Sequence, residues 1–114
     1  MSPTETGRKA ERAASAYLEM RGFEILERNF RRPRCEIDII AVKDKVVQFV
    51  EVKFRPDDDQ VSGFDAITST KLRQMARGAH IWVEETKWSG EYMLSAIEVS
   101  GPSFAIMGFI ENAF

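Results

Sequence analysis

The stretch that decides the fold reads Glu36-Ile37-Asp38-Ile39-Ile40-Ala41-Val42, then Lys43-Asp44-Lys45, then Val46-Val47-Gln48-Phe49-Val50-Glu51-Val52-Lys53-Phe54. Its two long runs are rich in β-branched residues, and only three residues separate them. They therefore predict a hairpin of two buried strands. Because residues two apart in a strand point to the same side, Glu51 and Lys53 are expected to share one face.

The register of this hairpin determines whether the charged side chains of its two strands meet. A two-residue turn at Lys43-Asp44 sets Glu36 opposite Glu51, whereas a turn at Asp44-Lys45 sets Asp38 opposite Glu51. Either register gathers the same charged groups on one surface, namely Glu36, Asp38, Glu51 and Lys53. A shift by one residue would instead split this set across the sheet.

Carboxylates that converge on an apolar surface raise each other's pKa, so a compensating charge is required. A hard divalent cation such as Mg²⁺ binds carboxylate oxygens, polarises a phosphoryl oxygen and activates water, while Lys53 can orient that water or stabilise developing charge. The pattern favours phosphodiester hydrolysis. The competing interpretation is a solvent-facing sheet edge with alternating Glu and Lys, but the apolar residues on both faces argue against it.

Apolar spacing on either side of the hairpin predicts two helices. One covers residues 5–21, with the apolar set Ala10, Ala13, Ala14, Tyr17 and Leu18. The other runs from an N-cap at Thr68 or Ser69 to about Glu85, with the apolar set Leu72, Met75, Ala76, Ala79 and Val83. Glu11 lies at the border of the first apolar face, where it either leans toward the charged patch or remains an exposed helix residue.

Further strands are expected at residues 23–30, near a sheet edge, and at residues 92–99 and 104–110. Residues 55–65 are expected to form a loop, and the run Asp57-Asp58-Asp59 within it is interpreted as solvated rather than metal-binding. This element order predicts an α/β (α+β) domain with a mixed sheet of about five strands flanked by helices.

The length of 114 residues suits a single domain over residues 1–114. No apolar run approaches the roughly 20 residues of a membrane span, and residues 1–9 are polar, so we expect a cytoplasmic protein without a membrane partner. One cysteine, Cys35, and one histidine, His80, exclude an internal disulfide and a Cys/His zinc cluster. The chain has no glycine-rich phosphate loop, so no nucleotide cofactor is expected.

Basic residues are concentrated in the first half of the chain. Residues 1–55 hold 12 Lys and Arg against 9 Asp and Glu, whereas residues 56–114 hold 4 against 9. The densest cluster is Arg28, Arg31, Arg32 and Arg34, which predicts either contacts to nucleic-acid phosphates or a solvated loop. A smaller basic set of Lys71, Arg73 and Arg77 in the second helix has the same two interpretations.

Several of these residues fall in motifs that resemble the bacterial YraN-like family. The motifs span nearly the whole chain: Gly7-x-x-Ala10-Glu11-x-x-Ala14-x-x-Tyr17-Leu18, Arg28-Asn29-Phe30-Arg31, Glu36-Ile37-Asp38-Ile39-Ile40-Ala41, Phe49-Val50-Glu51-Val52-Lys53-x-Arg55 and Glu111-Asn112-Ala113-Phe114. That family is assigned to the restriction-endonuclease-like PD-(D/E)xK superfamily, and the set Glu11, Asp38, Glu51 and Lys53 is similar to the active site of archaeal-type Holliday-junction resolvases.

The resemblance implies a role for each matching residue. Asp38 and Glu51 are implied metal ligands for Mg²⁺ or Mn²⁺, Lys53 the catalytic lysine and Glu11 an additional acid near the metal. Lys71 matches a family lysine and suits a contact with the DNA backbone. The likeness to resolvases further implies a homodimer acting on branched or otherwise structured DNA.

The chain also departs from the family pattern. Cys35 stands where relatives usually have Gly, Lys43-Asp44-Lys45 replaces a more glycine-rich turn, and Ser95 replaces the acid of a Phe-Asp-Val strand. The main hypothesis is therefore a Mg²⁺-dependent endonuclease acting on DNA. The alternatives are a nucleic-acid-binding module with a nuclease-like fold but no turnover, and a purely structural protein without DNA affinity.

Overall fold

The computed structural model describes residues 3–56 and 68–113, which form two helices and five strands. In chain order these are α1 (Pro3–Met20), β1 (Glu24–Arg32), β2 (Cys35–Lys43), β3 (Val46–Arg55), α2 (Ser69–Thr86), β4 (Glu91–Ser100) and β5 (Ala105–Ile110). The Asp57-Asp58-Asp59 run lies outside the described residues. Neither helix in the described part combines the length and the apolar character needed to span a membrane.

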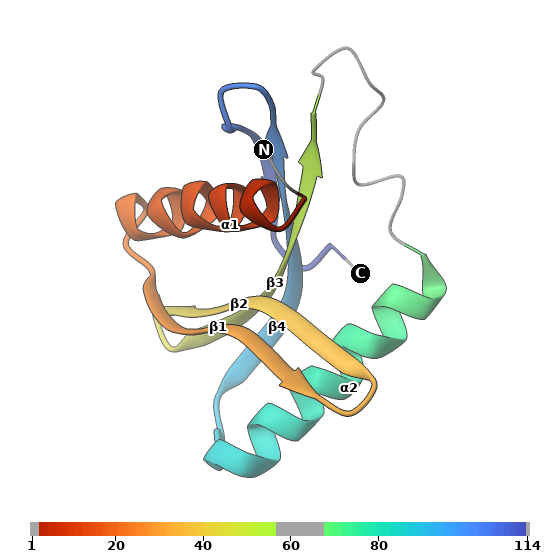
Figure 1. Ribbon diagram of the computed structural model, residues 1–114. Helices are drawn as coiled ribbons and strands as arrows, with labels where there is room; N and C mark the ends of the chain where they lie inside the picture. Colours follow the sequence, from red (N-terminus) through yellow and green to blue (C-terminus); the bar gives the residue numbers. More distant parts are fainter. Residues whose placement is uncertain (1–2, 57–67, 114) are drawn as a thin grey trace.

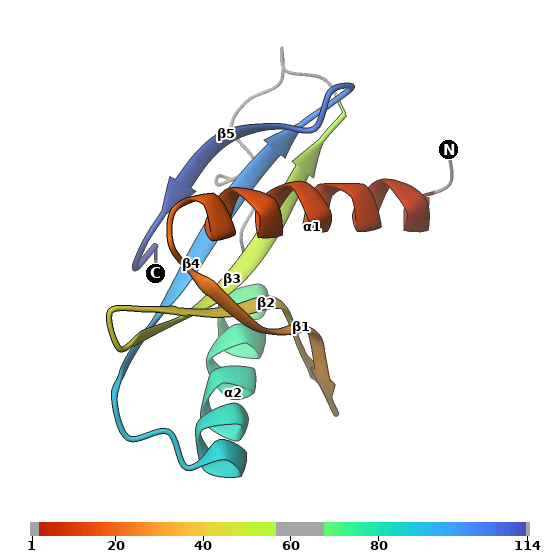
Figure 2. The same cartoon turned by 90° about the vertical axis from the view of Figure 1, so that its left-hand side faces the viewer.

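The strands form one mixed sheet in the order β1-β2-β3-β4-β5 (Figures 1 and 2). Only β3 and β4 are parallel, because α2 provides the crossover between them, and the other pairs are antiparallel. The predicted mixed sheet of about five strands is confirmed, and β1 lies at one edge as expected.

The helices lie on opposite faces of the sheet, and each covers its own apolar cluster (Figure 2). Buried α1 residues pack against one face, and small side chains at Ala10 and Ala14 let the helix lie close to the strands. On the other face, Ala79 and Trp82 of α2 pack with Phe49 and its neighbours. The predicted apolar face of α1 is thereby confirmed.

The buried face of α2 differs in part from the predicted one. Ala76 is exposed, and the buried stripe consists of Met75, Gly78, Ala79 and Trp82. Gly78 in this stripe packs closely against β2. A Cβ added at Gly78 would lie 2.8 Å from Cδ1 of Ile37. The helix therefore approaches β2 at a position where only a residue without a side chain avoids displacing Ile37.

Strands β2 and β3 diverge after only part of their length. Their pairing runs from Lys43–Val46 to Ile39–Val50, and beyond this point the β1–β2 hairpin turns away from β3 (Figure 2). Asn29 and Asp38 lie between the paired residues Arg28–Ile39 and Phe30–Ile37, and Asn29 has a φ of 54°. Ile37 and Ile39 consequently belong to the clusters on opposite faces, although they are two residues apart.

Candidate functional site

The two acids at the centre of the sequence hypothesis lie where β2 and β3 separate, a place we call the fork. The turn occupies Asp44 and Lys45, with φ values of 53° and 65°, as a tight hairpin turn requires. It sets Lys43 opposite Val46, so Asp38 falls opposite Glu51 by extension of this register. Of the two predicted registers, the structure adopts the one with the turn at Asp44-Lys45. Because the pairing of β2 with β3 ends at Ile39–Val50, it does not extend to Glu36, which forms an ion pair with Arg31 instead.

Asp38 replaces a missing backbone contact at the fork. The main-chain N–H of Val52 donates to Oδ2 of Asp38 at 2.8 Å, where a continuous β2–β3 ladder would have offered a carbonyl. This bond orients the carboxylate toward β3, where the Asp38 side chain also shares a hydrogen bond with the Glu51 side chain. The carboxyl of Asp38 is half-buried, and that of Glu51 is buried.

The surroundings of both acids favour their protonated forms. Burial, and then the neighbouring Asp38, raise the pKa of Glu51 to about 8, although Lys71 opposes this. Burial likewise raises the pKa of Asp38, against the opposing effects of the Val52 N–H and of Lys71. Two carboxyl groups this close cannot both ionise easily without an added cation.

The cation that the chain itself supplies to Glu51 is Lys71, from the first turn of α2. Its Nζ lies 3.2 Å from Oε2 of Glu51, and its side chain is 28% exposed. The same oxygen accepts no well-oriented hydrogen bond from the described residues. Thr68 caps the helix by accepting from the N–H of Lys71 at 3.1 Å, as predicted for the N-cap, and so holds this turn in place.

Lys53 lies on the same strand as Glu51, two residues further along, and is half-buried. In register it stands beside Glu98 of β4. Within residues 3–56 and 68–113, no hydrogen bond or ion pair joins Lys53 to Asp38 or Glu51. The site therefore offers two lysines in different positions, with Lys71 in contact with an acid and Lys53 beside the site.

Glu11 approaches the fork from α1. Burial and then the charge of Asp38 raise the pKa of Glu11, while a hydrogen bond with the Asn29 side chain lowers it. The helix residue is half-buried and lines a hollow of about 490 Å³ together with Thr4, Gly7, Arg8, Asn29 and Arg31. The structure thus brings Glu11 near Asp38. Of the two predicted positions for Glu11, it adopts the one directed toward the charged patch.

The four arginines of the basic cluster have different surroundings. Arg32 donates from Nε and Nη2 to the carboxylate of Glu85, at 2.8 and 2.6 Å, and its guanidinium lies over the Phe30 ring. Arg31 forms an ion pair with Glu36 at 3.4 Å and lines the hollow beside Glu11. Arg34 lies in the β1–β2 turn with a φ of 61°, and Arg28 is exposed on β1. The guanidinium group of Arg32 is therefore already paired with Glu85.

The candidate metal ligands are the two acids at the fork, Asp38 and Glu51. Among residues 3–56 and 68–113, no three His, Cys, Asp or Glu side chains come close enough together to form a metal cluster. Two facing carboxyl groups, Asp38 and Glu51, are nevertheless a donor set that suits Mg²⁺, which commonly takes one or two protein carboxylates and completes its shell with water and phosphate oxygens. Oε2 of Glu51 is paired with Lys71 but accepts no well-oriented hydrogen bond from the described residues, which is consistent with such a set.

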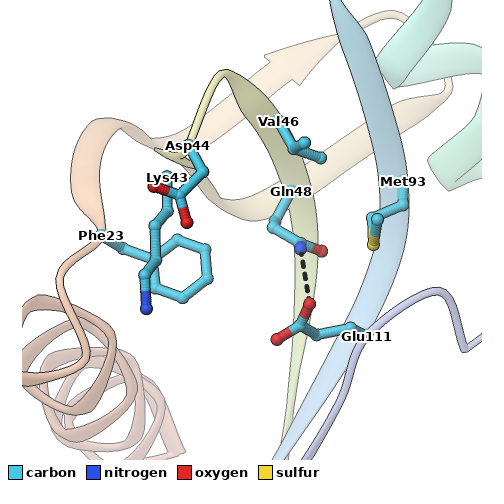
Figure 3. A pocket seen from close by; sticks show the side chains of 7 residues that line it. All are labelled: Phe23, Lys43, Asp44, Val46, Gln48, Met93 and Glu111. Carbon is cyan, nitrogen blue, oxygen red and sulfur yellow. Dashed lines mark hydrogen bonds between the residues drawn. The ribbon is translucent and has the colours of Figure 1, made fainter.

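A second hollow, of about 200 Å³, lies near the β2–β3 turn (Figure 3). Gln48 Nε2 donates to Oε2 of Glu111 at 3.2 Å, Ser95 Oγ donates to Oε1 of Gln48, and the N–H of Asn112 donates to Ser95 at 3.3 Å. These contacts satisfy the buried polar groups and fasten the C-terminal segment to β3 and β4. Ser95, the departure from the family pattern, belongs to this network.

Sequence reasoning did not identify three features of the site: the Lys71–Glu51 ion pair, the backbone conformation of Asn29, and Arg8. Arg8 could have been found, because it precedes Glu11 by three residues and so shares a helix face with it. Asparagine is among the few residues that adopt positive φ readily, which is a weak signal for a strand irregularity at Asn29. The Lys71–Glu51 contact depends on long-range packing and has no local signal.

Comparison with known proteins identifies relatives that match most of the chain. The model of the uncharacterised protein family UPF0102 matches residues 10–104. A UPF0102 protein of Sulfurihydrogenibium sp. (strain YO3AOP1) is 35% identical over 100% of this chain and 97% of its own length. One from Sulfurovum sp. (strain NBC37-1) is 38% identical over 96% of this chain and 94% of its own length. These relatives confirm the resemblance drawn from the sequence motifs.

Proposed function

This chain belongs to the uncharacterised protein family UPF0102, and we propose that it is a metal-dependent endonuclease that hydrolyses phosphodiester bonds in DNA. The observation that carries the proposal is the proximity of the Asp38 and Glu51 carboxyl groups at the fork, where Asp38 accepts from the N–H next to Glu51 and both acids have raised pKa values. Burying two acids together destabilises a fold, so their presence calls for a functional reason.

Asp38 and Glu51 are the residues that would hold the metal, Mg²⁺ or its substitute Mn²⁺. When bound, such an ion polarises a phosphoryl oxygen and lowers the pKa of a bound water. The Val52 N–H fixes the Asp38 carboxylate, which limits the motion of one ligand. Lys53 is proposed to orient the attacking water or to stabilise charge on the phosphorane, and Glu11 to act as the additional acid beside Asp38.

The proposed substrate is branched or otherwise structured DNA, and the proposed assembly is a homodimer. Both follow from the likeness of Glu11, Asp38, Glu51 and Lys53 to the active site of archaeal-type Holliday-junction resolvases. A symmetric dimer presents two equivalent sites, which suits a substrate with two equivalent strands.

The experiment is a cleavage assay with Mg²⁺ or Mn²⁺ on a labelled four-way junction and on a linear duplex of the same sequence. Wild type is compared with Asp38→Asn, Glu51→Gln and Lys53→Ala, and Glu19→Gln serves as a charge-matched control on the exposed side of α1. Loss of cleavage in the three site variants but not in the control supports the proposal. Equal cleavage by all five proteins identifies a contaminating nuclease and removes the support.

A second candidate function is a nucleic-acid-binding module without turnover. The observation that favours it is the Lys71–Glu51 ion pair, because a lysine that neutralises Glu51 reduces the need for a metal. This candidate predicts binding of branched DNA that persists in EDTA, with no cleavage in Mg²⁺ or Mn²⁺. Metal-dependent cleavage that is lost in Glu51→Gln excludes it.

A further inference from the structure

Two neighbouring hollows on the surface of the β1–β2 hairpin share one wall, the side chain of Arg31. The first is the hollow of about 490 Å³ beside Glu11 described above. The second, of about 280 Å³, is lined by Arg31, Arg32, Arg34, Cys35, Glu36 and Gln74. Together they form a surface, here called the arginine track, that runs from α1 across the hairpin to α2.

The arginine track carries guanidinium groups that are available to an external anion. No ion pair or hydrogen bond engages Arg8 or Arg34 within residues 3–56 and 68–113, whereas Arg32 is committed to Glu85. Arg31 is held by Glu36 at 3.4 Å, in a pair that is largely exposed and thus exchangeable. Each hollow contains one carboxylate, Glu11 in the first and Glu36 in the second.

Gly7 is an independent sign that the first hollow is kept open. A Cβ added at Gly7 would meet no atom within 4 Å, so neither packing nor a close approach requires glycine there. Glycine inside a helix is less favourable than alanine by about 1 kcal/mol. The chain therefore carries a helix-weakening residue, without a packing reason, in the wall of the hollow that Arg8 and Glu11 also line.

We propose that the arginine track binds two neighbouring phosphates of one nucleic-acid strand and delivers that strand to the fork. The identity of the occupant as nucleic acid rests on the proposed function. Planar guanidinium groups bind phosphate oxygens through paired hydrogen bonds, and the hollows offer additional donors from Asn29 and Gln74. Asn29 lines the first hollow and lies across the β1–β2 hairpin from Asp38, so the bound strand passes beside the fork. Contacts to phosphates alone make this binding independent of base sequence.

The test is fluorescence anisotropy with a labelled single strand and a labelled four-way junction, in EDTA and across a range of salt concentrations. Arg8→Ala and Arg31→Ala should each weaken binding roughly tenfold. The double variant should reduce the slope of log affinity against log salt by about 1.4 for a single strand. Arg12→Ala, an exposed arginine of α1 that lines neither hollow, is the matched control and should bind like wild type.

Two more variants separate the arginine track from general electrostatic attraction. Gly7→Leu fills the first hollow without changing charge, so it should weaken binding while the thermal midpoint stays the same or rises. Glu36→Gln releases Arg31 and should tighten binding. Binding by Gly7→Leu and by the double arginine variant that equals wild type overturns the inference.

The outcomes for the arginine track and for the nuclease are distinguishable because binding is measured without metal. Arginine-dependent binding without cleavage upholds the track and rejects the nuclease. Cleavage by wild type combined with unchanged binding in Arg8→Ala and Arg31→Ala upholds the nuclease and rejects the track. Vesicles of anionic phospholipid are tested in parallel, and equal arginine-dependent binding to them overturns the assignment to nucleic acid.

Discussion

Replacement of Glu51 by glutamine should change how stability depends on pH. Burial raises the pKa of Glu51 to about 8, whereas the unfolded chain has the ordinary value of 4.5. Between these values the folded protein retains a proton that the unfolded chain releases, so stability falls as pH rises. The group contributes its full stabilisation below about pH 4.5 and loses it as pH passes through about 8.

The size of the effect follows from the same pKa difference. One proton bound only in the folded state changes the free energy of unfolding by about 1.4 kcal/mol per pH unit. From about pH 6 to about pH 8, wild type without metal should therefore lose about 2 kcal/mol. The raised pKa of Asp38 acts in the same direction, while glutamine cannot ionise and removes the contribution of Glu51.

Urea unfolding in EDTA, followed by tryptophan fluorescence to which the buried Trp82 contributes, measures this dependence. Glu51→Gln should show a much flatter pH dependence than wild type, and Glu19→Gln, an exposed acid on α1, should retain the wild-type slope. Identical slopes for wild type and Glu51→Gln would refute the reasoning, because Glu51 would then ionise as freely in the folded as in the unfolded chain.

Three further predictions concern the surroundings of Glu51. At about pH 8, Mg²⁺ at a hundred times its dissociation constant should stabilise wild type by about 2.7 kcal/mol and leave the stability of Glu51→Gln unchanged. Thermal unfolding measures both, and an equal shift in the two proteins would mean that the ion binds elsewhere. Lys71→Ala should lower stability at about pH 8 more than Lys53→Ala does, because only Lys71 contacts Glu51, and equal urea midpoints would contradict this. Asn29→Gly should leave the unfolding free energy nearly unchanged while Asn29→Val lowers it by about 1 to 3 kcal/mol, since φ is 54°; a tolerated valine would argue against the bend.

Much of the fold was predictable because its signals are local. β-branched runs specify β2 and β3, and the three residues between them leave room only for a tight turn. Because side chains alternate between the two faces, the charged residues share a face only if the residue numbers of each pair add to an odd number. The facing of Asp38 and Glu51 follows from these rules. The choice between the two odd registers depends on which turn residues adopt positive φ, and Asp44 and Lys45 give only a weak local preference for it.

The remaining features of the site depend on contacts between distant parts of the chain. Arg32 belongs by sequence to the basic cluster, but Glu85, fifty-three residues away, engages it. Charge spacing could not reveal this, because the pairing requires β1 and α2 to be placed first. In the same way, the ion pair of Lys71 with Glu51 exists only once α2 crosses under the sheet.

Several departures from local stability meet around the fork. Glu51 and Asp38 are acids in surroundings that favour their neutral forms, Asn29 has a left-handed backbone, and Gly7 weakens a helix without a packing reason. Each could be replaced by a residue that suits its element better. Because strained and desolvated groups concentrate at functional sites, this coincidence supports the proposed site at the fork on grounds other than family resemblance.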